Sequence, residues 1–227
     1  MKFFPGNTDF IDIHSHRSYP EPGVFRIYND FLDNRQEVDY NGPKSTGIHP
    51  WHISGATDPV VVEKNLTEAL KFENVLFVGE TGLDRYRQTD IGLQTEIFRI
   101  HLDVAEKIKK PVILHCVRAF DELFRIREEV RPFQSWIFHG FNSSPEMART
   151  ACSMGIHISI GERLAKNRKK LEAILENVPL SAIFMETDDG DLSIAGLYEL
   201  VAEILQIELA ELKNYMLGNY KKIMTHE

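Results

Sequence analysis

The sequence has few cysteines, no long apolar run and no excess of positive charge, and each of these absences excludes a class of protein. Its 227 residues include two cysteines, Cys116 and Cys152, which form neither a disulfide framework nor a CxxC-type zinc motif. No apolar stretch approaches the roughly 20 residues that a membrane-spanning helix needs. The first residues also lack a secretory signal pattern, so we expect a cytoplasmic protein without membrane contact.

The charge balance is acidic, with a formal net charge of −8 and a pI near 5.6. Such a surface argues against broad, non-specific coating of nucleic acid, but it allows an enzyme whose bound metal ions supply positive charge locally. The length suits one α/β barrel, which typically has about 250 residues. We therefore expect residues 1–227 to form a single domain, and the protein to be a monomer.

Short apolar segments, rich in β-branched and aromatic residues, alternate with amphipathic segments that have helical spacing. Such alternation predicts a parallel sheet, here a TIM-type (β/α) barrel. The predicted helices cover residues 92–109, 119–130, 145–154, 164–177, 195–206 and 208–223. The predicted strands cover residues 9–14, 24–28, 45–49, 75–80, 111–115, 135–139, 155–160 and 182–187.

The first part of this pattern is irregular. Only residues 17–23, which include Pro20 and Pro22, separate the first two predicted strands. A parallel crossover normally needs at least about 10–12 residues. The sequence therefore predicts that the barrel lacks its first helix and that its second strand is distorted or antiparallel.

Side chains that bind metal ions occur where the predicted strands end. Considered singly, a histidine there can be an ordinary core residue, Glu80 can pair with Arg85 or Arg87, and Asp188 can belong to a solvated acidic loop. Because the carboxyl ends of barrel strands meet at one face, the joint pattern instead predicts one convergent site. His14 and His16 lie two residues apart, on one face of a strand. The predicted ligands are His14, His16, Glu80, His115, His139 and Asp188.

Four histidines and two carboxylates suffice for two divalent cations, which points to a hydrolase. Paired metal ions lower the pKa of bound water and stabilise the attacking and leaving oxygens. Glu80 is predicted to bridge the ions with one oxygen each, and Asp188 to bind one ion and accept the proton of the attacking water. Asp12, on the face of His14, is a candidate for orienting a ligand histidine. The donor set is compatible with Zn, Mn or Mg.

Several motifs resemble the TatD family of metal-dependent hydrolases, in the family's order and over nearly the whole chain. They are Asp12-x-His14-x-His16, Gly47-Ile-His-Pro50, Gly79-Glu-Thr-Gly-Leu-Asp84, Gln94 with Phe98, Pro111-Val-Ile-Leu-His115, His139-Gly-Phe and Glu186-Thr-Asp188. The resemblance implies a TIM barrel, two divalent cations and nuclease activity on DNA. It assigns His14, His16 and Asp188 to one ion and His115 and His139 to the other, with Glu80 as the bridge.

The chain departs from the family pattern in three loops. It is short between its first and third strands, has Asp189-Gly-Asp191-Leu-Ser in place of an aromatic residue and prolines, and has one extra residue in His115-Cys-Val-Arg118. Loops of this kind build the substrate pocket. The candidates for substrate binding are His49, Arg85 and Arg118, with Arg163 as a further candidate for phosphate.

The leading functional hypothesis is phosphodiester hydrolysis, with DNA or a small phosphodiester as substrate. Trp51 either stacks on a base or closes the top of the barrel. An alternative is an amidohydrolase acting on a small amide, lactone or ester, although such sites often use a carboxylated lysine where this chain has Glu80. A third hypothesis is a non-enzymatic barrel that binds a ligand. The sequence leaves the metal, the mode of cleavage and the true substrate open.

Overall fold

The structure is a computed structural model that describes residues 3–32 and 40–225. Eight strands follow one another around the sheet in chain order, and each is parallel to the next. They are β1 (Phe10–Ser15), β2 (Val24–Phe31), β3 (Lys44–Gly47), β4 (Val75–Asp84), β5 (Val112–Val117), β6 (Trp136–Phe138), β7 (Ile156–Ile160) and β8 (Ile183–Met185).

The sheet closes on itself just beyond the end of β8. Ser15 forms a parallel bridge with Asp188, the amide of Asp188 donates to the carbonyl of His14 at 3.0 Å, and the amide of His16 donates to Asp188 at 3.1 Å. The predicted TIM-type barrel is therefore confirmed. The closing bonds also fix two predicted metal ligands, His14 and Asp188, on adjoining backbones.

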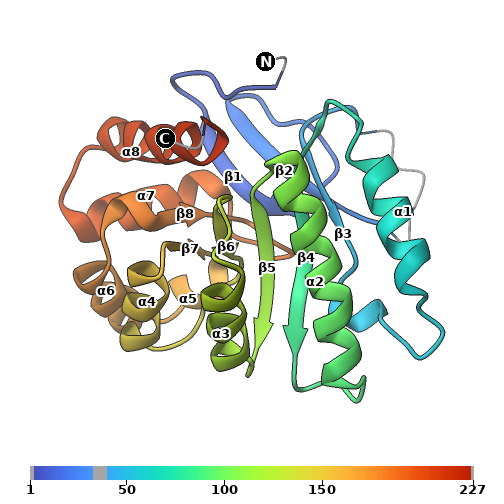
Figure 1. Ribbon diagram of the computed structural model, residues 1–227. Coiled ribbons are helices and arrows are strands. Elements are labelled where there is room, and N and C mark those ends of the chain that lie inside the picture. Colours follow the sequence, from blue (N-terminus) through green and yellow to red (C-terminus); the bar gives the residue numbers. More distant parts are fainter. Residues whose placement is uncertain (1–2, 33–39, 226–227) are drawn as a thin grey trace.

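Helices surround the barrel, and Figure 1 shows the arrowheads of β4 and β5 pointing to the end opposite α8. Within the described residues, no helix is both long and apolar enough to cross a bilayer. The α-helices are α1 (Pro59–Ala69), α2 (Ile91–Ile108), α3 (Phe120–Val130), α4 (Pro145–Ser153), α5 (Glu162–Ala165), α6 (Arg168–Asn177), α7 (Ile194–Leu205) and α8 (Leu209–Thr225), and two short 3-10 helices are η1 (Pro50–His52) and η2 (Leu180–Ala182).

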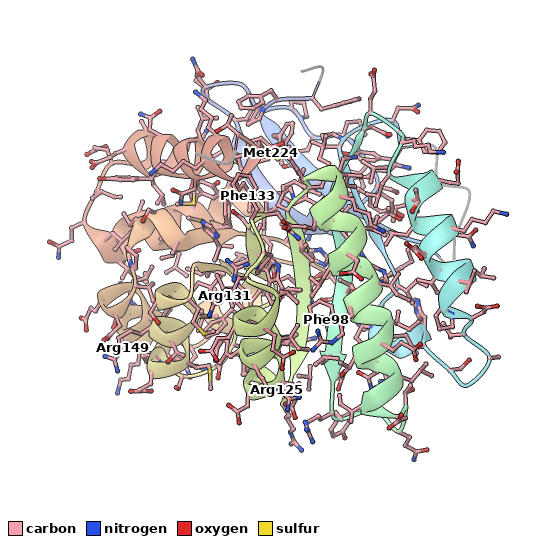
Figure 2. The ribbon with its side chains drawn as sticks, in the orientation of Figure 1. Phe98, Arg125, Arg131, Phe133, Arg149 and Met224 are labelled. Atoms are coloured by element: carbon pink, nitrogen blue, oxygen red, sulfur yellow. The ribbon has the colours of Figure 1, made fainter. Side chains whose placement is uncertain are left out.

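The helices turn their apolar faces to the sheet, and side chains fill the space between the two layers (Figure 2). Phe98 of α2 meets Trp136 of β6 edge to face, with ring centroids 5.7 Å apart. The helix starts follow local chemistry: Ser144 caps α4 by accepting a hydrogen bond from the amide of Met147 at 3.3 Å, and Pro145 occupies the first turn. This confirms the predicted start of that helix.

The irregular first part is only partly as predicted. Residues 16–23 contain no helix, as expected, but β2 is parallel to β1, so the antiparallel alternative is wrong. The irregularity is a register shift between Asp12 and Ser15, so it lies in β1 and not in the second strand, which the sequence predicted to be distorted. A second correction concerns the helix predicted over residues 164–177, which is divided into α5 and α6 because Asn167 caps a new helix start by accepting from the amide of Lys170.

His157 of β7 gives the barrel an acid-sensitive element. Burial among side chains that include Phe184 lowers its pKa to about 4. Since the unfolded imidazole titrates near 6.5, the unfolded chain binds the proton first, and this group's contribution to stability is lost as the pH falls from about 6.5 towards 4. We expect the loss of unfolding free energy between pH 7.5 and pH 4 to be about 3 kcal/mol smaller in His157→Gln than in the unmodified chain. Urea titrations at both pH values test this, and equal losses would contradict it.

Candidate metal centre

The six predicted ligands come from five strands and meet at the carboxyl end of the barrel. Each of four overlapping groups places its potential ligand atoms within 4.8 Å of one another. They are His14 with Glu80 and His139, His14 with His16 and Asp188, His49 with Glu80 and His115, and His139 with Glu186 and Asp188. The convergence that the strand ends predict is thus present in the structure.

Glu80 lies at the centre of the cluster, and its two carboxylate oxygens face different histidines. Oε1 lies 2.9 Å from His115 Nδ1 and 2.7 Å from His139 Nε2. Oε2 lies 3.5 Å from His14 Nε2 and accepts a hydrogen bond from Asn29 Nδ2 at 3.5 Å. The carboxylate therefore separates the histidines into the two sets that a bridging ligand between two ions would require.

His14, His16 and Asp188 form the second half of the cluster. Asp188 Oδ1 lies 3.5 Å from His14 Nε2 and 3.3 Å from His16 Nε2. His14 is fully buried, whereas His16 and Asp188 are partly exposed to solvent. Asp188 also has a left-handed backbone with φ of 50°, which a non-glycine residue adopts at a cost in free energy. The exposed edge of the site is therefore at His16 and Asp188.

The charges in this cluster stabilise each other. Burial alone would raise the pKa of Glu80, but His139, His115 and His49 outweigh it and hold that pKa well below the ordinary value. Burial likewise opposes a charge on His139, yet Glu80 and Glu186 raise its pKa well above the ordinary value. Burial would also raise the pKa of Asp188, but His14 and His16 lower it. The carboxylates are therefore ionised and available as metal ligands at neutral pH.

The residues present fit divalent cations. Both ring nitrogens of His14 are buried and have no hydrogen-bond partner in the described part of the chain, although Nε2 lies between carboxylate oxygens of Glu80 and Asp188. A buried imidazole without a partner is costly. A cation bound between the imidazole nitrogen and the two carboxylates would satisfy all three groups.

Two glycines let β4 carry Glu80 close to β5. Gly79 has φ of 135°, and a Cβ there would lie 2.4 Å from the carbonyl oxygen of Ile113. Gly82 has φ of 142°, and a Cβ there would lie 2.1 Å from the carbonyl oxygen of His115. A side chain at either position would separate the two strands and move Glu80 away from His115.

Three polar residues for which the sequence predicted no role, Asn29, Asp84 and Glu186, contact the predicted ligands. Asn29 Oδ1 accepts from the amide of Glu80 at 2.9 Å. Asp84 Oδ2 lies 3.2 Å from His115 Nε2. Burial would raise the pKa of Asp84, but hydrogen bonds from His115 and Trp51 help to lower it to about 2. The sequence held a signal for Asp84, because in an extended strand it lies on the same face as Glu80.

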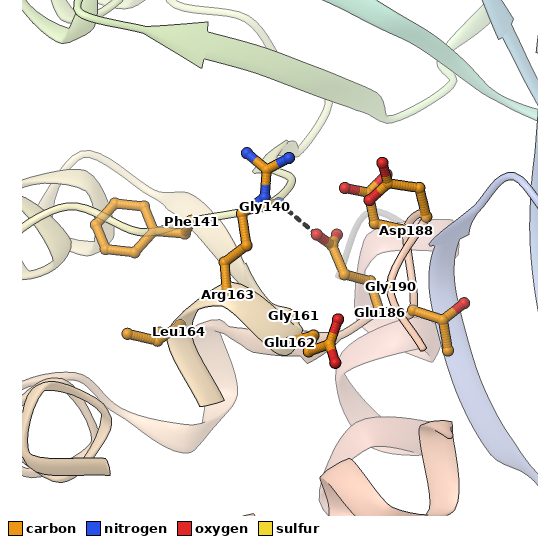
Figure 3. A pocket seen from close by; sticks show the side chains of 11 residues that line it. Gly140, Phe141, Gly161, Glu162, Arg163, Leu164, Glu186, Asp188 and Gly190 are labelled. Atoms are coloured by element: carbon orange, nitrogen blue, oxygen red, sulfur yellow. Dashed lines mark hydrogen bonds between the residues drawn. The ribbon is translucent and has the colours of Figure 1, made fainter. Parts of the chain in front are cut away.

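Glu186 is the third of these residues. One of its carboxylate oxygens accepts the amide of Gly140 and lies 3.8 Å from His139 Nδ1. Figure 3 shows the Glu186 carboxylate pointing towards Gly140, in a small pocket that Arg163 and Asp188 also line. Its other oxygen is buried without a hydrogen-bond partner among the described residues. Carboxylates placed behind ligand histidines hold the imidazole ring in orientation.

Asp12 does not have the predicted contact with a ligand histidine. Its carboxylate pairs with Arg26 Nε at 2.8 Å and accepts hydrogen bonds from the amide and the hydroxyl of Thr187, both at 2.8 Å. The register shift after Asp12 explains the difference, since strict alternation no longer relates it to His14. Asp12 instead anchors the segment that leads into Asp188.

Of the three substrate-binding candidates, His49 lies in the cluster, whereas Arg85 and Arg118 lie on the surface. His49 belongs to the cluster itself, with Nε2 3.0 Å from Glu80 Oε1, and burial lowers its pKa. Arg85 is exposed and pairs with Glu122 of α3. Arg118 is exposed at the end of β5, with its guanidinium carbon 5.6 Å from the centre of the Tyr86 ring. Trp51 is 53% exposed, and its ring centroid lies 5.0 Å from that of His49 and 6.2 Å from that of His115.

Comparison with known proteins agrees with this geometry. The family model for TatD related DNase matches residues 29–225. The chain belongs to the TatD family. Relatives in this family are named metal-dependent hydrolases, and the described residues of this chain include clusters of histidine, glutamate and aspartate that could hold metal ions.

Two relatives and one solved structure show how similar this chain is to other proteins. An uncharacterized metal-dependent hydrolase of Buchnera aphidicola is 33% identical over 152 residues, which are 66% of this chain and 56% of the relative. YcfH of Escherichia coli K12, named in the same way, is 32% identical over 170 residues, which are 74% of this chain and 61% of the relative. The chain thus matches less than two thirds of the length of either relative.

The solved structure is that of YjjV, a TatD homologue from Escherichia coli K12. It superposes with a TM-score of 0.79 at 22% identity and covers 97% of this chain and 99% of that one. At this level of identity the similarity supports the barrel fold alone.

Proposed function

We propose that this chain hydrolyses phosphodiester bonds, with DNA as the substrate, at two divalent cations of the Zn, Mn or Mg type. The division of the Glu80 oxygens between His14 on one side and His115 with His139 on the other carries this proposal. In it, His14, His16 and Asp188 hold one ion, His115 and His139 hold the second, and Glu80 joins them. The description of the matching family as TatD related DNase supports the choice of substrate.

The bound ions would acidify water and stabilise charge on the phosphodiester oxygens. The protein supplies the remaining functions. Asp188 is partly exposed and lies beside His14 and His16, so it is placed to take the proton of the attacking water. His49 has a pKa lowered by burial and is therefore neutral near pH 7, which suits it to donate a hydrogen bond within the site. Asp84 and Glu186 keep the rings of His115 and His139 in place.

The test is metal reconstitution followed by digestion of labelled DNA. We expect cleavage with at least one of Zn²⁺, Mn²⁺ or Mg²⁺, none in excess chelator, and a fall to the metal-free level in the double variant His14→Ala with Glu80→Ala. Glu68→Ala on α1 is the control, because its side chain is exposed and pairs only with Lys71 in the described structure.

Two results would contradict the proposal. If the double variant digests DNA as fast as the unmodified chain, the activity comes from a contaminant. If the metal-loaded chain leaves DNA and small phosphodiesters intact but hydrolyses a lactone, amide or carboxylic ester, the amidohydrolase alternative is correct. The absence of any lysine from β4, where that class often carries a carboxylated one, favours the phosphodiester hypothesis.

A further inference from the structure

Two exposed aromatic residues at the rim of the metal centre are fixed to one buried carboxylate. Trp51 follows β3 and is 53% exposed, and Tyr86 follows β4 and is 74% exposed. Asp84 Oδ2 accepts from Trp51 Nε1 at 2.6 Å, and Asp84 Oδ1 accepts from the amide of Tyr86 at 2.8 Å. Asp84 also lies 3.2 Å from His115 Nε2. Both loops are therefore fixed relative to His115, on the side of the metal centre away from His14, His16 and Asp188.

An arginine guanidinium lies over each of these aromatic rings. The guanidinium carbon of Arg87 lies 3.8 Å from the centre of the Trp51 ring, and that of Arg118 lies 5.6 Å from the centre of the Tyr86 ring. A guanidinium that stacks on a ring keeps its in-plane N–H donors available to an anion. Within residues 3–32 and 40–225 neither arginine pairs with a carboxylate, whereas Arg85 pairs with Glu122 of α3.

The backbone of Arg118 supports a functional role for this rim. Five described non-glycine residues have positive φ, and Lys109, Arg131 and Gln206 have it because they end helices. The other two are Asp188, at the metal centre, and Arg118, with φ of 53° directly after β5. Strained backbone of this kind concentrates at functional sites. With this left-handed backbone, Arg118 precedes the first turn of α3, and its guanidinium lies beside the ring of Tyr86.

We propose that Trp51, Tyr86, Arg87 and Arg118, here named the arginine–aromatic rim, bind an unpaired nucleotide next to the phosphodiester that is cleaved. The inference rests on the proposed function and adds a binding site to it. A base can stack on an aromatic ring or on the plane of an arginine, and the guanidinium donors bind the flanking phosphate. Bases in a duplex are already stacked, so the rim selects single-stranded or frayed ends. A small lactone or ester has no group for these arginines.

Fluorescence gives a direct test, because the chain has two tryptophans and Trp136 is fully buried. The full chain, loaded with Zn²⁺, is titrated with a short phosphorothioate oligothymidylate that resists hydrolysis. We expect saturable quenching of tryptophan fluorescence in the unmodified chain and none in Trp51→Phe. The double variant Arg87→Gln with Arg118→Gln is expected to bind at least about tenfold more weakly. The slope of its log affinity against log salt concentration should be shallower by about 0.7 for each phosphate that the variant no longer neutralises.

The matched control removes the same number of positive charges from the helices. Arg99 and Arg125 are exposed on α2 and α3 and lie near Glu129, so Arg99→Gln with Arg125→Gln should bind the oligonucleotide like the unmodified chain. In turnover assays, the rim variant should show a raised KM for an oligonucleotide, whereas Arg99→Gln with Arg125→Gln should show the KM of the unmodified chain.

Different results would contradict the proposed nucleotide-binding rim and the proposed hydrolytic function. If the rim variant and its control bind equally well, or if the unmodified chain shows no quenching, the rim is overturned even when DNA is cleaved. If the oligonucleotide quenches and the rim variant weakens binding, but no metal supports cleavage of DNA, the rim stands and the hydrolytic function fails.

Discussion

Replacing Glu80 by glutamine is expected to abolish both metal binding and hydrolysis while leaving the barrel folded. Glutamine keeps the size of the side chain but removes the charge that His14, His49, His115 and His139 surround. Loss of a group behind a metal ligand costs about 10–100-fold in affinity, and the loss of a bridging ligand affects both ions, so the decrease should exceed that range. Metal content per chain after gel filtration, measured by mass spectrometry, is the primary readout.

The control for Glu80→Gln is Glu162→Gln, which removes a carboxylate at the same end of the barrel. Glu162 pairs with Lys166 and accepts from the amide of Asp191, but it contacts none of the histidines of the cluster. We expect this variant to keep its metal and its activity. Retention of the normal metal content by Glu80→Gln would show that the carboxylate is not a bridge.

The sequence predicted all eight strands, and for most of them the signal is a short apolar run, which survives without any tertiary information. β3 is the exception, because its residues Lys44–Gly47 read KSTG. The sequence predicted the ends less well. β4 continues to Asp84, beyond the expected end at residue 80, because Gly79, Thr81 and Gly82 interrupt the apolar pattern while pairing with β5 extends the strand. Helix α1 was not predicted, although Asp58 followed by Pro59 is a helix-start signal that the structure uses.

The ligand set was predictable for a related reason. The candidate ligands lie at or near the ends of five strands, so a purely local pattern combined with the rule for barrel strands placed all six together. The groups behind them were not predictable in this way. Asn29 contacts Glu80 across 51 positions of sequence, and Asp12 contacts Thr187 across 175. No local spacing encodes such pairs, because they depend on how neighbouring strands align and on the register shift in β1.

The buried ion pair between Arg26 and Asp12 is expected to have the largest effect on stability. Both side chains are almost fully buried, and burial raises the pKa of Asp12 even with Arg26 beside it, so the pair does not fully offset the cost of removing the carboxylate from water. Arg26→Met would leave that carboxylate buried without a counter-ion. We expect a loss of about 3–5 kcal/mol in the free energy of unfolding, measured by urea denaturation followed by circular dichroism.

The double variant Arg26→Met with Asp12→Asn separates this mechanism from a simple packing defect. With both charges gone, the oxygen of the asparagine still accepts from the amide of Thr187, so most of the lost stability should return. Arg168→Met is the surface control, since that arginine pairs with Glu172 and Glu203 in solvent and should hardly affect stability. If the double variant is no more stable than Arg26→Met, the unpaired charge is not the cause. If it recovers stability and also keeps its metal, Asp12 acts on Asp188 through hydrogen bonds to Thr187 and not through its charge.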